Sequence, residues 1–173
     1  MVEQDDIQQD DIQQDDIQRD DTGTSAPPQA PRPHPRLRDL DVLEGTWRLE
    51  GRDPTTGETF TGIVAREWLP GGFFMTQRTE TDGHPQAGLE YIGYDSTAGS
   101  LRSMLFSDEG PGPFCPFALE YFWDITGDQL TIWHGYRDSP ARFVGTIDHA
   151  ARTVTGRWEW PGGGYDATTV RID

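Results

Sequence analysis

From Leu37 to the C-terminus, the chain consists of short runs in which apolar and polar residues alternate, and each run ends in residues that favour turns. In the first run, Leu43, Gly45, Trp47 and Leu49 are separated by polar or charged residues. A period of two places successive side chains on opposite faces of a β-strand. Turns recur about every eight to twelve residues, which is typical of an antiparallel sandwich or barrel and leaves no room for long helices.

The alternating runs predict about ten strands and one short helix. Segments such as Pro70-Gly71-Gly72 and Thr126-Gly127-Asp128 are typical of tight turns between strands. Ten antiparallel strands in succession favour a closed up-and-down barrel, because closure removes the exposed edges of an open sheet. The expected helix covers about 35–43, and the expected strands cover about 43–50, 58–69, 73–81, 88–94, 101–107, 117–125, 130–137, 142–148, 153–160 and 165–172.

The N-terminal part of the chain has a different composition. Residues 4–18 are three copies of the pentapeptide Gln-Asp-Asp-Ile-Gln, and five prolines follow between positions 27 and 35. A period of five turns the isoleucines by about 140° per repeat on a helix and alternates their faces on a strand, so no apolar stripe forms. Residues 1–37 are therefore predicted to be a disordered acidic repeat with a proline-rich linker, and residues 38–173 the barrel. The acidic arm is interpreted as an interaction arm or a lid, or as a repeat expansion that only adds solubility.

The charged residues and the single cysteine exclude several classes of function. Thirty acidic residues against 14 basic residues, all of them arginine, give a net charge of −16, which disfavours binding to nucleic-acid phosphates. Without lysine there is no Schiff-base, pyridoxal-phosphate or phosphate-loop chemistry. Cys115 cannot form an internal disulfide, and it is predicted to be a buried, inert thiol.

Other sequence signals are missing as well. The chain has no long apolar run and begins with acidic rather than basic residues, so we expect a cytoplasmic protein without membrane contact. No Gly-x-Ser-x-Gly motif occurs, which excludes the α/β-hydrolase mechanism.

Four motifs occur in a fixed order along the barrel region: Leu-Glu-Gly-Thr-Trp-Arg-Leu-Glu-Gly at 43–51, Glu-Trp-Leu-Pro-Gly-Gly-Phe-Phe at 67–74, Tyr-Ile-Gly-Tyr-Asp at 91–95 and Gly-Arg-Trp-Glu-Trp at 156–160. Together they resemble a family of bacterial domains of unknown function that is expected to form lipocalin-like (calycin) barrels. The resemblance runs from about residue 38 to the C-terminus and implies an all-β fold without an established chemistry. In barrels of this type Gly45 and Trp47 would close one end, with Arg157 or Arg171 stacked on the indole.

The Gly-Thr-Trp motif is also similar, more distantly, to that of the nitrobindins. Those barrels bind haem through a histidine on a strand near the C-terminus, and the last expected strand here, 165–172, contains none. His134 is the one histidine placed to point inward, so a haem would depend on it alone. No two of the four histidines share a strand at the spacing of metal ligands, and we predict no cofactor and no metal.

The aromatic residues point to a function inside the barrel. Six tryptophans, eight phenylalanines and five tyrosines exceed the need of a plain core, and alternating large aromatic residues can line an apolar pocket. Strand parity predicts which side chains face inward. These are Trp47, Leu49, Phe73, Met75, Gln77, Leu89, Tyr91, Leu119, Tyr121, Trp123, Ile132, His134, Tyr136, Gly156, Trp158 and Trp160.

Parity also leaves alternatives open. One bulge inverts a strand, and inversion of the strands at 88–94 and 117–125 would turn Glu90 and Glu120 inward as carboxylates with raised pKa values. In the 101–107 strand, either the odd or the even positions could face inward. The polar inward groups could orient a ligand or transfer a proton, or each could simply find a backbone partner; they are Gln77, Tyr91, Tyr121, His134 and Tyr136.

These observations predict a single-domain barrel that binds a small hydrophobic or aromatic ligand. The alternative is a cofactor-independent lyase, isomerase or cyclase, in which Tyr121, His134 or Tyr91 acts as acid or base and Arg78 polarises a carbonyl. A protein-interaction module that uses the acidic arm is a third hypothesis, and a homodimer remains open. The expected ligand-binding residues are Phe73, Met75, Gln77, Tyr91, Tyr121, Trp123, His134, Tyr136 and Trp158.

Overall fold

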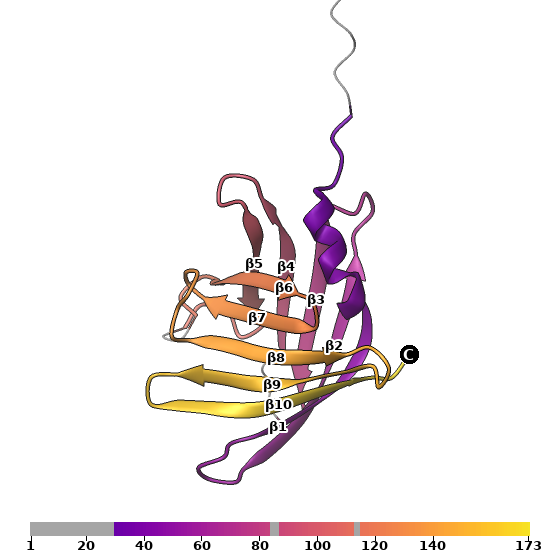
Figure 1. Ribbon diagram of the computed structural model, residues 1–173. Helices are drawn as coiled ribbons and strands as arrows, with labels where there is room; N and C mark the ends of the chain where they lie inside the picture. The colour runs from indigo at the N-terminus through magenta and orange to yellow at the C-terminus, as the bar shows by residue number, and fades with distance from the viewer. Residues whose placement is uncertain (1–29, 84–86, 113–114) are drawn as a thin grey trace, which may run out of the picture. The chain divides into compact units, whose positions relative to one another are not determined.

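The structure is a computed structural model that describes residues 30–83, 87–112 and 115–173. Within these ranges the chain forms one 3₁₀ helix and ten strands (Figure 1). Their bounds are η1 Pro35–Leu43, β1 Gly45–Arg52, β2 Thr59–Trp68, β3 Phe74–Thr81, β4 Ala87–Asp95, β5 Ser100–Ser107, β6 Leu119–Thr126, β7 Gln129–His134, β8 Arg142–Asp148, β9 Thr153–Trp160 and β10 Gly163–Arg171.

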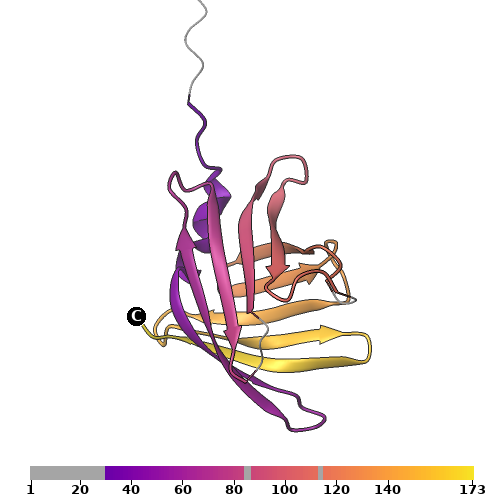
Figure 2. The ribbon, with the colours of Figure 1, turned by 180° about the vertical axis from the view of Figure 1, so that it is seen from behind.

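The ten strands form one closed barrel. Each strand pairs antiparallel with the next strand along the chain, and β1 pairs with β10 to complete the ring (Figures 1 and 2). In this closing pair Trp47 lies opposite Arg171 and Arg52 lies opposite Asp166. The predicted antiparallel up-and-down barrel is therefore confirmed. Within the described ranges, no helix combines the length and the apolar character needed to cross a membrane.

The element boundaries follow local sequence signals. The helix has the predicted bounds, and most strands begin and end within two residues of the prediction. The exception is the strand expected at 130–137, which ends at His134. Gly135 follows with a φ of 78°, a left-handed conformation that turns the chain out of the sheet. Tyr136 therefore lies beyond the strand, in the loop before β8.

Gly45 is a position at which the fold requires glycine. Its φ is 110°, and a Cβ there would lie 2.7 Å from both Arg171 Nε and Asp173 Oδ1. Arg171 Nε in turn donates to Asp173 Oδ1 at 2.7 Å. The guanidinium of Arg171 thus packs against the backbone of β1 and not on an indole.

The expected stacking of an arginine on Trp47 is wrong. Arg171 is held over Gly45, and Arg157 forms a 2.8 Å ion pair with Asp166. In the part of the chain that the structure describes, the cation–ring contacts are instead those of Arg102 over Phe122 and Arg137 over Trp133. Carboxylates next to both candidate arginines outcompete the ring, because a charge-assisted hydrogen bond is the stronger interaction.

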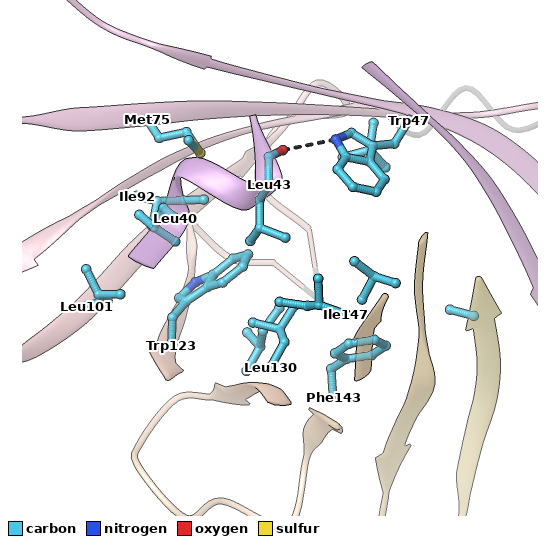
Figure 3. Packing of buried hydrophobic residues seen from close by; sticks show 14 of the residues in the cluster. Leu40, Leu43, Trp47, Met75, Ile92, Leu101, Trp123, Leu130, Phe143 and Ile147 are labelled. Atoms are coloured by element: carbon cyan, nitrogen blue, oxygen red, sulfur yellow. Dashed lines mark hydrogen bonds between the residues drawn. The ribbon is translucent and has the colours of Figure 1, made fainter. Parts of the chain in front are cut away.

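The helix η1 fills one end of the barrel interior (Figure 3). Its leucines, Leu37, Leu40 and Leu43, are buried. In an up-and-down barrel, the beginnings of odd-numbered strands and the later parts of even-numbered strands meet at the same end, and the core around the leucines comes from these parts. It includes Trp47, Met75, Ile92, Leu101, Trp123, Leu130, Ile147 and Val154. Trp47 Nε1 donates to the Leu43 carbonyl at 3.0 Å, so Trp47 belongs to this closed end, as expected.

The compact unit that contains the barrel begins at Arg32, earlier than the predicted boundary at residue 38. Leu37 is only 4% exposed, and it is part of the core. Arg36 forms a 3.0 Å ion pair with Asp39 inside η1 and another of 3.0 Å with Asp124 of β6, which attaches η1 to the wall. The end of the predicted linker is therefore structural. The predicted disorder of residues 1–29 concerns a segment outside the described residues.

Candidate functional site

The barrel holds a cavity of about 580 Å³. It begins at Leu43 of η1 and extends toward the opposite end, where Trp160 lines it while remaining 44% exposed. The cavity is thus closed by η1 and opens at the other end of the barrel. It is lined by Leu43, Leu49, Val64, Arg66, Gln77, Thr79, Glu90, Leu105, Tyr121, Trp123, Leu130, Ile132, His134, Ala141, Phe143, Val154, Trp158, Trp160, Tyr165, Ala167 and Thr169.

One wall of the cavity is aromatic. On β6 to β9, the ring of Tyr121 lies 5.8 Å from that of Trp158 in an edge-on arrangement, and Phe143 lies 5.8 Å from the same indole. The imidazole of His134 lies 5.5 Å from the Tyr121 ring. Neighbouring strands place these rings side by side because all four residues have the inward parity of their strands. The result is a continuous surface for a flat or aliphatic molecule.

The other wall carries a chain of hydrogen bonds across β2 to β6. Arg66 Nε donates to Gln77 Oε1 at 2.6 Å, and Gln77 Nε2 donates to Glu90 Oε2 at 2.8 Å. From the other side, Trp123 Nε1 donates to Ser103 Oγ at 2.8 Å, and Ser103 Oγ donates to Glu90 Oε1. These residues meet because Arg66, Gln77 and Glu90 are cross-strand neighbours in register. Every donor in the chain points toward Glu90, which accepts from both sides.

Burial controls the ionisation of this wall. Glu90 is 2% exposed, and the loss of water raises its pKa from 4.5 to about 7, against the opposing effects of the Ser103 hydrogen bond and the Arg66 charge. Burial also lowers the pKa of Arg66 to about 10, although the charge of Glu90 opposes the change. Both groups therefore lie in a site where a charge is poorly solvated.

The tyrosines of the cavity are poor proton donors at neutral pH. Burial, followed by the charge of Glu90, raises the pKa of Tyr121, and burial raises the pKa of Tyr165 to about 12. Within 30–83, 87–112 and 115–173, the Tyr121 hydroxyl and the His134 imidazole have no hydrogen-bond partner. Both groups line the cavity, so they could bind a polar atom of a ligand there.

The structure brings together five of the nine predicted binding residues. Gln77, Tyr121, Trp123, His134 and Trp158 line the cavity. Met75 also points inward, but it is fully buried in the core at the closed end and not part of the cavity lining.

Three predicted residues lie elsewhere, and these predictions are wrong. Phe73 precedes β3, in the turn after β2. Tyr91 is 40% exposed, because Gly88, Glu90 and Ile92 form the buried face of β4. Tyr136 is 60% exposed, since Gly135 ends β7 before it. The proposed roles of Tyr91 as an acid or base and of Phe73 and Tyr136 as ligand contacts therefore do not apply.

Arg78 is also misplaced for catalysis. It lies on the outer face of β3, where it forms ion pairs with Glu80 at 2.9 Å and Asp108 at 3.0 Å. It cannot polarise a carbonyl inside the barrel.

The parity alternatives have different outcomes on the three strands concerned. On β4 the inverted face is the observed one, with Glu90 inside and Leu89 outside the cavity lining. On β6 the original parity holds, and Glu120 forms an ion pair with Arg102. On β5 the odd positions face inward, which places Ser103 beside Glu90.

Sequence reasoning missed Arg66 and Tyr165 and treated Glu90 and Ser103 only as alternatives. A usable signal was present for Glu90. Gln77 already had the inward parity on the preceding strand, and a buried glutamine needs polar partners on the strands beside it. Glu90 meets that need, whereas the inward tyrosine predicted at position 91 would not have reached Gln77 in register.

The cavity offers few ligands for a metal or a haem. In the part of the chain that the structure describes, no group of three or more His, Cys, Asp and Glu side chains could hold a metal ion. His134 is the histidine in the cavity lining, so it is the residue that would hold a haem iron. Cys115 is buried, as predicted.

No protein-family model matches the chain, and no curated protein matches it.

Proposed function

We propose that this barrel binds a small, mainly apolar molecule that contains a ring. The observation that carries the proposal is the cavity of about 580 Å³ with the aromatic wall formed by Tyr121, Phe143 and Trp158. Ligand pockets typically measure about 300–1,000 Å³, and they are lined by apolar side chains with a few polar groups that fix orientation. The resemblance to lipocalin-like barrels supports the same conclusion. A location in the cytoplasm is part of the proposal, supported by the single cysteine.

The first experiment looks for the natural ligand. The full chain is purified under mild conditions and examined by native mass spectrometry and by absorbance. A small molecule that leaves on denaturation supports the proposal. A Soret band would identify haem and would favour His134 as its ligand instead.

A second experiment measures binding with a defined probe, N-phenyl-1-naphthylamine, which is uncharged and fluoresces in apolar surroundings. Ala141 lines the cavity and Ala151 is exposed in the turn after β8. Ala141→Trp should weaken probe binding at least about tenfold, because the indole takes up cavity space, whereas Ala151→Trp should not. Equal binding by both variants, or no binding to the unchanged protein, would refute a ligand site in the barrel.

An enzyme that uses the same cavity is the second candidate, and Glu90 favours it. A buried carboxyl with a pKa of about 7 is suited to accept or donate a proton at neutral pH. The candidate reaction is a cofactor-independent lyase, isomerase or cyclase step in which Glu90 transfers the proton and Tyr121 or His134 forms hydrogen bonds to the substrate. Incubation of the full chain with the co-purified molecule should then give time-dependent conversion that Glu90→Gln abolishes; an unchanged molecule argues for binding alone.

A further inference from the structure

The guanidinium of Arg66 is buried with most of its hydrogen-bonding capacity unused. Arg66 is 8% exposed, and it lines the cavity. An arginine has five N–H donors, and in the described part of the chain only Nε–H has an acceptor, the Gln77 side chain. Nη1 is buried with no partner. A buried N–H group that has neither water nor an acceptor lowers the stability of the folded protein. An oxygen atom of a bound molecule would provide the missing acceptor.

Glu90 does not fulfil this role. The amide of Gln77 lies between the two charged groups, accepting from Arg66 and donating to Glu90. Within the described ranges no ion pair joins Arg66 to a carboxylate. Glu90 itself already accepts from Gln77 and Ser103. The protein thus places a cation in the wall of the cavity and leaves its outer nitrogens without an anionic partner.

The aromatic wall lies across the cavity from Arg66. In a closed ring of ten strands, β3 is five strands away from β8, so the β2 to β4 side faces the side formed by β7 to β9. Arg66 and Gln77 belong to the first side, and Phe143 and Trp158 to the second. Along the barrel, Arg66 lies near the end of β2 and so toward the closed end, whereas Phe143 and Trp158 lie toward the open end. A molecule that spans the cavity would therefore meet a guanidinium at its inner end and an apolar surface toward the mouth.

We propose that the cavity selects an organic oxyanion, a mainly apolar molecule with one carboxylate whose oxygens accept hydrogen bonds from Arg66. This inference rests on the proposed function and adds the chemical class of the ligand. Arginine suits the task because its planar N–H groups match a carboxylate and stay charged at every relevant pH. Tyr121 and His134, which face the same space from the aromatic wall, would supply contacts to a second polar atom of the ligand.

The test uses two probes of nearly equal shape, 2-naphthoate and 2-naphthamide, which differ in charge. Each is titrated at pH 8 against the full chain loaded with N-phenyl-1-naphthylamine, and displacement gives the two affinities. The carboxylate should bind about 10- to 100-fold more tightly than the amide, as expected for a hydrogen bond to a charged group. The net charge of −16 repels anions in general, so such a preference cannot come from nonspecific attraction.

Two substitutions identify the source of the preference. Arg66→Met should reduce the affinity ratio of naphthoate to naphthamide to about one, whereas Arg48→Met, which removes an exposed arginine of β1, should keep the ratio. Glu90→Gln removes a negative charge in the cavity wall that repels an anion, and it should tighten naphthoate binding at least about threefold at pH 8. If Arg66→Met does not fold, the naphthoate affinity of Glu90→Gln tests the proposal instead.

Each outcome has a distinct meaning. If the neutral fluorophore does not bind, the proposed function fails. If it binds but naphthoate and naphthamide compete equally with the unchanged protein, or if Glu90→Gln leaves naphthoate affinity unaltered, the cavity is a ligand site in which water satisfies Arg66, and the oxyanion proposal is overturned.

Discussion

At the scale of single residues, the interior of this barrel contains a basic and an acidic side chain in one network of hydrogen bonds. Arg66 and Glu90 are both buried, and each is connected to its neighbours by neutral side chains and not by a direct ion pair. Charges held in this way cost stability, because burial removes water and the mutual attraction is weakened by the distance between them. Such an arrangement is typical of a site used for binding or catalysis.

The raised pKa of Glu90 predicts an unusual pH dependence of stability. The folded protein holds the Glu90 proton up to about pH 7, whereas the unfolded chain releases it near 4.5, so the unfolding free energy falls as the pH rises through this window. Between pH 5 and pH 8 the loss from this group is about 2–3 kcal/mol. Urea unfolding at both pH values measures it, and Glu90→Gln should remove this loss.

Glu80→Gln is the matched control, since Glu80 is exposed on β3 and paired with Arg78. It should keep the wild-type difference between pH 5 and pH 8. Identical differences in the wild type and in Glu90→Gln would mean that Glu90 is ionised in the folded state over the whole range.

Tyr121 and His134 allow a binding protein to be distinguished from an enzyme. One neutral hydrogen bond to a ligand contributes about 0.5–1.5 kcal/mol, whereas a positioned acid or base contributes about 10²- to 10⁴-fold in rate. Tyr121→Phe and His134→Gln should each weaken binding of the co-purified molecule by no more than about tenfold, measured by calorimetry. A hundredfold loss of turnover with nearly constant affinity would instead identify the substituted residue as an acid or base.

At the scale of elements, η1 decides where the cavity can be. Its three buried leucines occupy the end of the barrel formed by the start of β1 and the end of β2, and Trp47 is hydrogen-bonded to the last of them. The opposite end has no such plug in the described residues, and the aromatic wall lines the space there, whereas Arg66 lies toward the closed end, opposite Gly45 in register. One short helix therefore gives the barrel a closed and an open end.

Trp47→Ala should test the closed end. Trp47 is 2% exposed and donates to Leu43, so its truncation should cost about 3–5 kcal/mol in the unfolding free energy measured with urea. Trp160→Ala is the matched comparison at the mouth, where the indole is partly exposed, and it should cost much less. If Trp47→Ala kept its stability but lost ligand affinity, Trp47 would belong to the binding site and not to the plug.

At the scale of the whole molecule, the chain divides into an acidic N-terminal segment and the unit that starts at Arg32. Residues 1–21 carry nine acidic residues and one arginine, half of the net charge of −16. The repeat pattern predicts no buried apolar face for this segment. The barrel, in contrast, includes residues that the sequence suggested were linker, because Leu37 fills its core and Arg36 is paired with β6.

Two truncations should locate this boundary. Removal of residues 1–31 should leave the melting temperature unchanged within about 1 °C, because a segment without a buried face adds little stability. Removal of residues 1–37 should lower it by at least about 5 °C, since Leu37 and the ion pairs of Arg36 are lost. Differential scanning calorimetry measures both. A lower melting temperature for the shorter truncation would indicate that the acidic segment docks on the barrel.

The sequence by itself determined the number, order and approximate bounds of the strands and the helix at 35–43. These features depend on local signals: alternation with a period of two, and turn residues such as Gly72 and Gly127 that tolerate positive φ values. Closure of the sheet into a barrel could also be expected, because unpaired edge strands are unfavourable in any antiparallel sheet.

Only the tertiary structure decided which face of β4 lies inside and therefore what the cavity can do. Alternation has two phases, and the apolar count favoured Tyr91 over Glu90. The carboxylate is nonetheless buried, because Gln77 and Ser103 on the adjacent strands provide the donors that make its burial tolerable. Those donors are 13 positions away along the chain on either side. Their proximity arises from strand register, which no pattern within one strand contains.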